Sequence, residues 1–315
     1  MPQLQVSLFG KAKIKYQGTL LTNIPAKAQE VFCFLLINRK RPFTREFLID
    51  LLWGNVSPAK GKKYLRDTLW RLQSECESQL NLPLDTILVM ENEWIYVHLQ
   101  ADVWIDVHIL EQAFKVATTI PEFDLKDEHM QDLTTAIILY EGDLMEGWYQ
   151  DWCILEREYL QLIYLSTIDR LMVCFEARHR YEEGILHGLA GLRYDWARER
   201  THRRLMRLYY LSGDRTAALR QYQQCQSILK SEFNVQPEPK TAALYDQICK
   251  GQPIHRTAEQ SRPATVAPNI HTLLPNLLEA LHTLKNVLAV TNPQSDLGDQ
   301  TTLAMELNPK IYPEA

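Results

Sequence analysis

The second half of the chain contains an internal repeat at a shift of 34 residues. The repeated positions are apolar or small: Leu171, Met172, Phe175, Gly184 and Ile185 recur as Leu205, Met206, Tyr209, Ala218 and Leu219. A helix pair of this length cannot bury its apolar face alone, so neighbouring pairs have to stack on one another. The small residue early in each second helix allows the close helix contact that such a stack needs. The repeat therefore predicts an all-α domain of stacked helix pairs, to which we assign residues 101–250.

A period of 34 residues with two helices per unit is that of tetratricopeptide repeats. Apolar positions within 106–117 predict a short helix that connects this domain to the preceding part of the chain. Repeat stacks present extended surfaces that bind protein segments more often than they catalyse reactions. The repeat thus favours an interaction function for this domain.

The first hundred residues show a different pattern, with short strands around three helices. Period-two alternation predicts strands over 4–9 and 13–16, and a turn at Gln17-Gly18 leads into a further short strand. Helices are expected from Pro25, from Thr44, which is a good N-cap, and after Ser57-Pro58. The stretches 86–90 and 94–97 then form a hairpin around Glu91-Asn92-Glu93. This order of sheet, three helices and terminal hairpin predicts a winged helix over residues 1–100, in which the third helix enters the DNA major groove.

The third helix carries a basic face opposite an apolar stripe. Leu65, Leu69, Leu72 and Cys76 recur at helical spacing and are expected to be buried. Lysines occupy the first turn, where free backbone N–H groups also favour a phosphate partner. We therefore predict that the residues contacting DNA are Lys60, Lys62, Lys63, Arg66, Asp67, Trp70 and Arg71. A solvated charged face, which most surface helices have, is the alternative interpretation.

The distribution of charge agrees with a DNA-contacting head. The chain has a formal net charge of −5, yet its first hundred residues contain 13 Lys and Arg against 9 Asp and Glu. A modestly basic module joined to an acidic body suits contact with DNA at one end and with protein at the other. No apolar run approaches the roughly 20 residues of a membrane helix, and the N-terminus has no signal-peptide pattern. The six cysteines are dispersed and favour buried free thiols in a reducing compartment. We expect a cytoplasmic protein.

The motifs of common enzymes do not occur in this sequence. Gly61-Lys62-Lys63 departs from a Walker A loop in its glycine spacing and in the residue that follows Lys62. His179 and His187 lie eight positions apart without a third ligand, and no paired cysteines suggest a zinc site. We therefore expect no enzymatic activity, no metal and no cofactor.

The composition changes after Lys250. Residues 251–269 are rich in Pro, Thr and Ala and predict a linker. Leucines alternate at spacings of three and four within 270–292, which predicts an amphipathic helix, and residues 293–315 form a tail. The helix has three possible roles that the sequence leaves open: docking on its own protein, self-association, or binding a partner.

Several stretches of the chain resemble SARP-type transcriptional regulators, which join a response-regulator-type winged helix to a bacterial transcriptional activator domain. They are 45–54 and 65–72 in the first part, and Tyr140-Glu141-Gly142-Asp143-Leu144, Trp152, Glu156-Arg157, 204–206, 213–215, 217–222 and 237–241 in the second. The resemblance covers about four-fifths of the chain. It implies an α+β N-terminal winged helix followed by an all-α tetratricopeptide-like helical repeat domain. It further implies an activator that binds repeated promoter sites in double-stranded DNA and helps to recruit RNA polymerase, with contacts between neighbouring subunits.

Two features depart from that pattern. The expected wing tip, Glu91-Asn92-Glu93, is acidic, whereas a wing that reaches the minor groove usually carries Arg or Lys. The expected recognition face also includes Asp67 and Trp70. These departures motivate an alternative hypothesis, a protein-interaction adaptor whose winged helix does not bind DNA.

Overall fold

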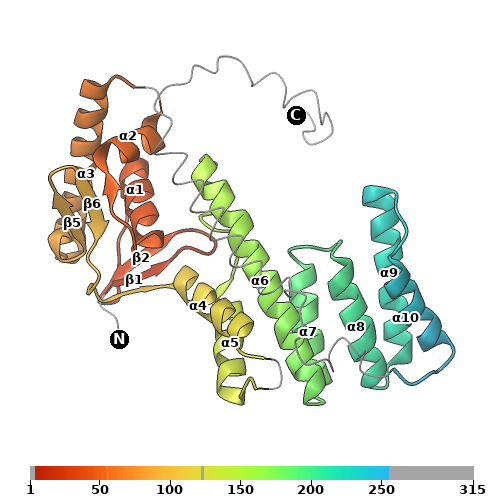
Figure 1. Cartoon of the computed structure of the whole chain (residues 1–315). Helices are drawn as coiled ribbons and strands as arrows, with labels where there is room; N and C mark the ends of the chain where they lie inside the picture. Colours follow the sequence, from red (N-terminus) through yellow and green to blue (C-terminus); the bar gives the residue numbers. More distant parts are fainter. Residues whose placement is uncertain (1–3, 55, 122–123, 255–315) are drawn as a thin grey trace. The chain divides into compact units, whose positions relative to one another are not determined.

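The computed structural model describes residues 4–54, 56–121 and 124–254, which begin with a small sheet and continue through a series of helices (Figure 1). The predicted tail 293–315, the predicted amphipathic helix 270–292 and most of the predicted linker 251–269 lie outside these residues.

The N-terminal sheet has four strands in the order β3-β2-β1-β7. Their bounds are β1 Leu4–Ser7, β2 Lys13–Tyr16, β3 Thr19–Leu20 and β7 Val103–Ile105. β1 pairs antiparallel with β2 and parallel with β7, so that Leu4 lies opposite both Tyr16 and Val103. β7, the last strand in the sequence, thus pairs with β1, the first.

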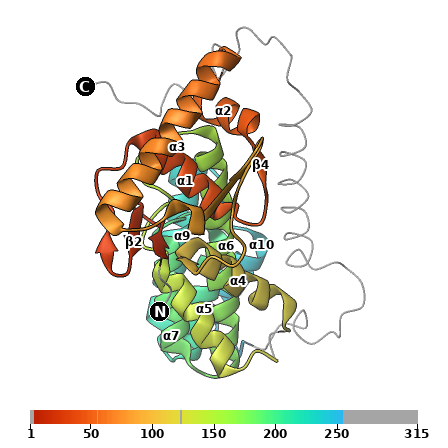
Figure 2. The ribbon, with the colours of Figure 1, turned by 90° about the vertical axis from the view of Figure 1, so that its left-hand side faces the viewer.

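Three helices and a second sheet complete the winged helix. They are α1 Ala26–Ile37, α2 Arg45–Trp53, α3 Pro58–Leu80, the 3-10 turn η1 Leu84–Thr86, and the strands β4 Phe43–Thr44, β5 Leu88–Glu91 and β6 Trp94–Val97. Thr44 caps α2 as expected, because its hydroxyl accepts a hydrogen bond from the backbone N–H of Phe47. β5 and β6 form the predicted hairpin, and the short β4 adds to its open edge. Figure 2 views this region from the side on which α3 runs.

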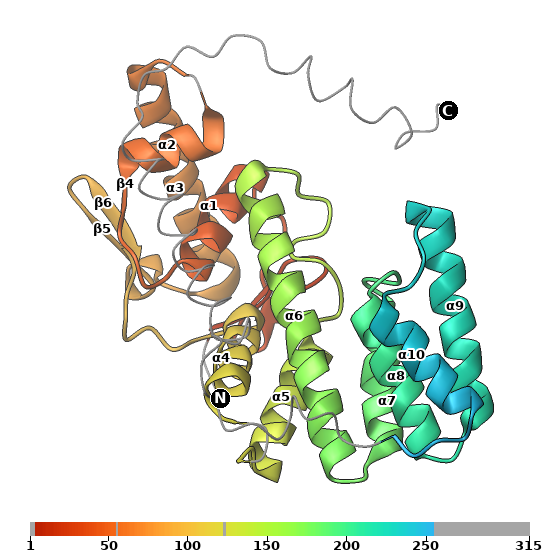
Figure 3. The same cartoon turned by 45° about the vertical axis from the view of Figure 1, so that its right-hand side comes forward.

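The helical part consists of α4 Asp106–Thr119, α5 Asp127–Leu139, α6 Asp151–Ala177, α7 Tyr181–Leu192, α8 Glu199–Leu211, α9 Arg215–Phe233 and α10 Pro239–Cys249. The predicted repeat is confirmed: its two copies are the helix pairs α6–α7 and α8–α9, which follow one another in Figure 3. Leu171 and Leu205 are both fully buried. A Cβ atom at Gly188 would lie only 2.7 Å from Leu205 Cδ2, so α7 approaches α8 more closely than a larger residue would permit.

The winged helix and the first helices of the second part share one hydrophobic core, and main-chain hydrogen bonds join them. Gly10 donates a backbone hydrogen bond to Asp143 O at 2.8 Å, and Met145 donates one to Leu8 O at 2.8 Å. Arg157 on α6 donates two hydrogen bonds to Leu144 O, at 3.2 and 2.9 Å. The stretch from Tyr140 to Met145 therefore bonds to the winged helix through its main chain, and Arg157 holds that stretch against α6.

Two expectations need correction, and one element was not predicted. β1 ends at Ser7 instead of Phe9, because the N–H groups of Leu8 and Phe9 turn toward the Asp106 carboxylate. The strand β7 was not predicted, because its three residues show no pattern of their own. Five cysteines are buried as expected, but Cys249 is exposed.

Candidate nucleic-acid interface

The helix α3 is anchored by an apolar stripe that faces α1 and α2. Leu65, Leu69, Leu72 and Cys76 are buried, as the spacing predicts. Gly61 is buried as well, and a Cβ atom there would lie 2.4 Å from Ile49 Cγ2. The first turns of α3 therefore pack directly on α2, which fixes the position of the opposite face.

That opposite face is open to solvent. The structure exposes Lys60, Lys62, Lys63, Arg66, Trp70 and Arg71, and it leaves Asp67 half-buried. Trp70 is 66% exposed, which is unusual for a large indole. All seven residues singled out by the sequence thus lie on one helix, with five cations among them.

The ion pairing on this face is weak. Arg66 Nε lies 3.7 Å from Asp67 Oδ1, and the two side chains are 75% and 49% exposed, so solvent screens this pair strongly. Tyr64, which the sequence analysis did not single out, is 41% exposed beside the face and packs its ring on Trp53 at 5.9 Å. The N-cap residue Ser57 forms no side-chain hydrogen bond with the helix, and Pro58 occupies the first turn. The start of α3 thus offers lysines and uncapped backbone N–H groups to an anion.

The wing is held beside the start of α2 through its main chain. Arg45 donates a backbone hydrogen bond to Glu93 O at 2.8 Å, and its Nε donates to Asn92 O at 2.7 Å. The acidic side chains of Glu91 and Glu93 are exposed. The negatively charged wing tip therefore lies next to the start of α2, the helix that precedes the basic helix α3.

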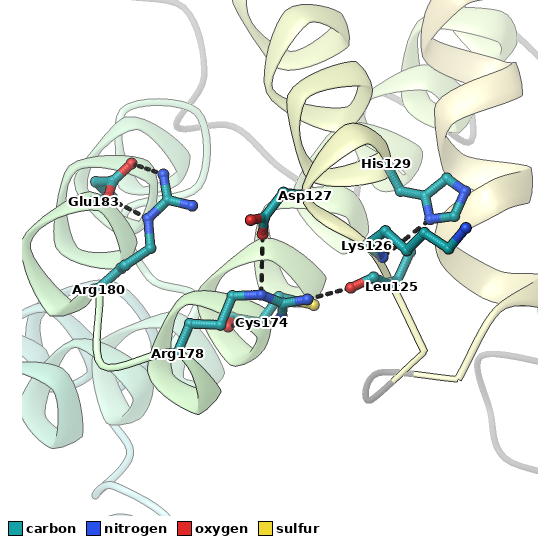
Figure 4. A network of polar contacts seen from close by, with 8 residues as sticks. All are labelled: Leu125, Lys126, Asp127, His129, Cys174, Arg178, Arg180 and Glu183. Atoms are coloured by element: carbon teal, nitrogen blue, oxygen red, sulfur yellow. Dashed lines mark hydrogen bonds and ion pairs between the residues drawn. The ribbon is translucent and has the colours of Figure 1, made fainter.

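A second set of polar contacts lies where the start of α5 meets the end of α6, and at the start of α7, as Figure 4 shows. Arg178 Nε pairs with Asp127 Oδ1 at 3.2 Å, and Arg178 also donates to the backbone oxygen of Leu125. Arg180 forms a two-point ion pair with Glu183, with contacts of 2.6 and 2.5 Å. These side chains satisfy one another and stabilise the ends of helices, which explains their presence without a ligand.

Among the described residues no group of three or more His, Cys, Asp and Glu side chains is arranged to hold a metal ion. Within the same residues, no helix is long and apolar enough to cross a membrane.

The fold and the exposed basic helix define a class: a winged helix joined to tetratricopeptide-like helix pairs. Residues 105–249 match the family described as the bacterial transcriptional activator domain. The transcriptional regulatory proteins EmbR of Mycobacterium tuberculosis and of Mycobacterium bovis are each 20% identical over 287 residues, which cover 86% of this chain and 69% of the relative. The solved structure of Mycobacterium tuberculosis EmbR in complex with a low-affinity phosphopeptide has the same fold, with a TM-score of 0.63 at 18% identity over 89% of this chain and 71% of that one. Residues 105–249 of the chain are thus similar to the bacterial transcriptional activator domain, and the described residues share the fold of EmbR.

Proposed function

We propose that this protein is a cytoplasmic transcription activator that reads double-stranded DNA with α3 and contacts RNA polymerase through its helical domain. In this proposal residues 1–100 form the DNA-binding domain, 101–250 the activator domain, 251–269 a linker and 270–292 an accessory helix. The protein performs no catalysis and requires no cofactor.

The observation that carries the proposal is the face of α3 opposite its buried stripe. Lys60, Lys63, Arg71 and the exposed indole of Trp70 lie on this face, with Arg66 at its flank and Lys62 beside it near the start of the helix. Among the described residues, the ion pair of Arg66 with Asp67 neutralises one of these cations weakly. An α-helix fits the major groove, where Arg and Lys pair with guanine edges and with phosphates. Lys60, Lys62 and Lys63 at the first turn suit the phosphates, whereas Arg66, Trp70 and Arg71 along the helix suit the base edges. Asp67 suits a cytosine amino group.

Two copies of the chain are proposed to occupy repeated promoter sites. The support for this is the match of residues 105–249 to the bacterial transcriptional activator domain, together with the stacked helix pairs, which suit protein contacts. The acidic wing tip supports a mode in which the wing stays away from the phosphate backbone, because carboxylates beside phosphate weaken binding.

The test is the triple variant Lys63→Ala/Arg66→Ala/Arg71→Ala, measured by fluorescence anisotropy with promoter DNA over a range of salt concentrations. Loss of three contacts of about 1 kcal/mol each is expected to weaken binding roughly a hundredfold. The loss of Lys63, the phosphate contact among the three, is also expected to flatten the dependence of log K on log salt by about one unit.

A matched control removes the same charge from another face of the head. Lys11, Lys13 and Lys15 are exposed on and beside β2. Their triple alanine variant is expected to keep promoter affinity within about threefold, since these residues lie away from the proposed reading helix. If the α3 variant binds as tightly as the wild type, or if both triple variants lose affinity equally, α3 is not the reading helix.

The second function is the adaptor, favoured by the acidic wing. Sequencing of genomic DNA recovered with the protein separates the two functions. Reproducibly enriched sites exclude the adaptor, and the absence of any enriched site excludes the activator.

A further inference from the structure

The helix α6 continues well beyond the helix that is paired with it. α6 has 27 residues and α7 has 12, and Figure 3 shows the first turns of α6 extending past the end of α7. The end of α7 lies beside the middle of α6, because Gln161 Nε2 donates a hydrogen bond to Tyr194 O at 3.3 Å. In the same region, a Cβ atom at Gly191 of α7 would lie 3.7 Å from Leu165 Cδ2. The turns of α6 that precede Gln161 therefore lie beyond the end of α7.

These first turns of α6 have one exposed face. It consists of residues at the spacing i, i+3, i+4 and i+7, which share one side of a helix: Asp151, Ile154, Leu155 and Glu158. Ile154 is 38% exposed and Leu155 is 50% exposed. On another side of the same turns, Trp152 is buried against α1. We call the exposed side, made of these four residues, the α6 face.

The α6 face has the apolar character of a helix side that another helix covers. Leu155 is followed on the same side of the helix by Leu162 and Leu165, at intervals of seven and three residues. Leu165 is only 4% exposed, at the level where α7 packs on α6. The same side of α6 thus changes from covered to open at the end of α7. A second helix laid along Ile154 and Leu155 would continue the cover that α7 provides further on.

The surroundings of the α6 face are acidic. Residues 141–158 contain six Asp and Glu against one Arg. Asp151 and Glu158 stand at the two ends of the face, on either side of its apolar pair. Among the described residues, no ion pair neutralises either carboxylate. The single cation, Arg157, directs its guanidinium at backbone oxygens of the preceding loop, including Leu144 O at 2.9 Å.

We propose that the α6 face is a docking site for a basic amphipathic helix of a partner protein. Ile154 and Leu155 bind the apolar side of that helix, and Asp151 and Glu158 pair with its Lys or Arg side chains. The two carboxylates are seven residues apart, about 10 Å along the helix axis. Two cations seven residues apart on the partner, with apolar residues between them, therefore match the face in both spacing and sign.

The charges disfavour other occupants of the α6 face. The phosphates of DNA or of an anionic lipid surface would be repelled by the six carboxylates of residues 141–158. The α6 face of a second copy would place Asp151 and Glu158 against carboxylates of the same kind. The inference depends neither on DNA binding by α3 nor on a contact with RNA polymerase. Peptide binding in the Lys63→Ala/Arg66→Ala/Arg71→Ala variant is expected to equal that of the wild type, which separates a failure of one proposal from a failure of the other.

The experiment measures, by fluorescence anisotropy, the binding of a designed peptide to the full chain. The fluorescein-labelled peptide repeats Lys-Ala-Ala-Leu-Leu-Ala-Ala twice and ends in Lys, so that lysines seven residues apart flank a leucine pair. One comparison peptide has Glu in place of Lys, and another has Gln in place of Leu. We expect only the first peptide to bind, with an affinity that falls as salt rises from about 50 to about 300 mM.

Two variants of the chain test the two parts of the α6 face. Ile154→Gln/Leu155→Gln removes its apolar centre and is expected to weaken binding of the basic peptide at least about tenfold. Asp151→Asn/Glu158→Gln removes its charges and is expected to weaken binding about fivefold at low salt and to reduce the salt dependence. If the first variant has a lower Tm than the wild type, Leu155→Gln alone replaces it, because Leu155 is the more exposed of the two residues.

Each test variant has a matched control on other helices. Ile138→Gln/Leu186→Gln changes the same residue types at positions that are 68% and 67% exposed. Asp132→Asn/Glu232→Gln removes the same two charges from exposed positions on α5 and α9. Both controls are expected to change the affinity for the basic peptide by less than about twofold.

The proposal is overturned if the basic peptide does not bind, or if the peptide with Glu in place of Lys binds equally well. Equal affinities of the test variants and the wild type overturn it too, as do equal losses in test and control variants. Light scattering covers the remaining occupant. A dimer that becomes a monomer in Ile154→Gln/Leu155→Gln would assign the α6 face to a second copy of the chain, against the proposal.

Discussion

The indole Nε1–H of Trp152 on α6 donates a hydrogen bond of 3.2 Å to the Glu30 carboxylate on α1, joining residues 122 positions apart. Glu30 is only 1% exposed, and its other oxygen pairs with Lys27 at 2.9 Å. The Trp152 ring also packs edge-on against Phe34 at 5.3 Å. A buried charge of the winged helix thus depends on a donor from the helical domain.

Trp152→Phe is expected to destabilise the chain by about 1–3 kcal/mol. The ring is retained, but a buried carboxylate loses one of its two donors. Urea unfolding measures the change, with Trp196→Phe as the control because Trp196 is 58% exposed. The control is expected to remain within about 0.5 kcal/mol of the wild type. Indistinguishable unfolding midpoints for Trp152→Phe and the wild type would show that the hydrogen bond contributes nothing to stability.

Asp106→Ala is expected to destabilise the same junction with a characteristic pH dependence. The Asp106 carboxylate accepts N–H bonds from Leu8 at 2.7 Å, Phe9 at 3.0 Å and Val107 at 2.8 Å. Burial nevertheless raises the pKa of Asp106 from 3.8 to about 6, with those hydrogen bonds opposing the shift. Between these two values the folded chain keeps a proton that the unfolded chain has released, so the contribution of Asp106 to stability falls as pH rises.

The destabilisation caused by Asp106→Ala is therefore expected to be larger near pH 4 than at pH 7, by about 2 kcal/mol. Unfolding free energies of variant and wild type across this range provide the test. A difference that is constant with pH would mean that Asp106 titrates alike in the folded and unfolded chains.

His108→Gln is expected to show the opposite pH dependence two residues away. His108 Nε2 lies 3.0 Å from Ile37 O, and burial, followed by the charges of Arg39 and Lys40, lowers the pKa of His108 from 6.5 to about 4. The neutral ring contributes stability above pH 6.5 that is lost as pH falls toward 4, because the unfolded chain takes up the proton first. The destabilisation caused by His108→Gln should therefore shrink on acidification. If it grows instead, the assigned direction of the shift is wrong.

The sequence predicts those elements that are marked by the spacing of residues within the element itself. The 34-residue period locates α6 to α9, and the spacing of Leu65, Leu69 and Leu72 identifies both the buried and the exposed sides of α3. Contacts between distant segments leave no such pattern. β7 is three residues long and is specified by its parallel pairing with β1, and Glu30 is buried only because Trp152 and Lys27 reach it. Likewise, Asp169 lies within a helix whose sequence gives no sign of the three arginines that meet it.

Gly61→Ala is expected to weaken DNA binding without removing any charge. The added Cβ would lie 2.4 Å from Ile49 Cγ2 and 3.3 Å from Val56 Cγ2, so the first turns of α3 must move away from α2. A shift of the lysines and of Arg66 relative to the groove is expected to reduce promoter affinity about tenfold, and overpacking is expected to cost about 1–3 kcal/mol of stability. Ile49→Ala removes the obstructing methyl group, and combining it with Gly61→Ala should restore affinity above that of Gly61→Ala alone. The four proteins form a double-mutant cycle, in which a favourable coupling between the two positions is the expected result. Additive losses in the double variant would show that the contact between α2 and α3 at Gly61 does not position the basic face.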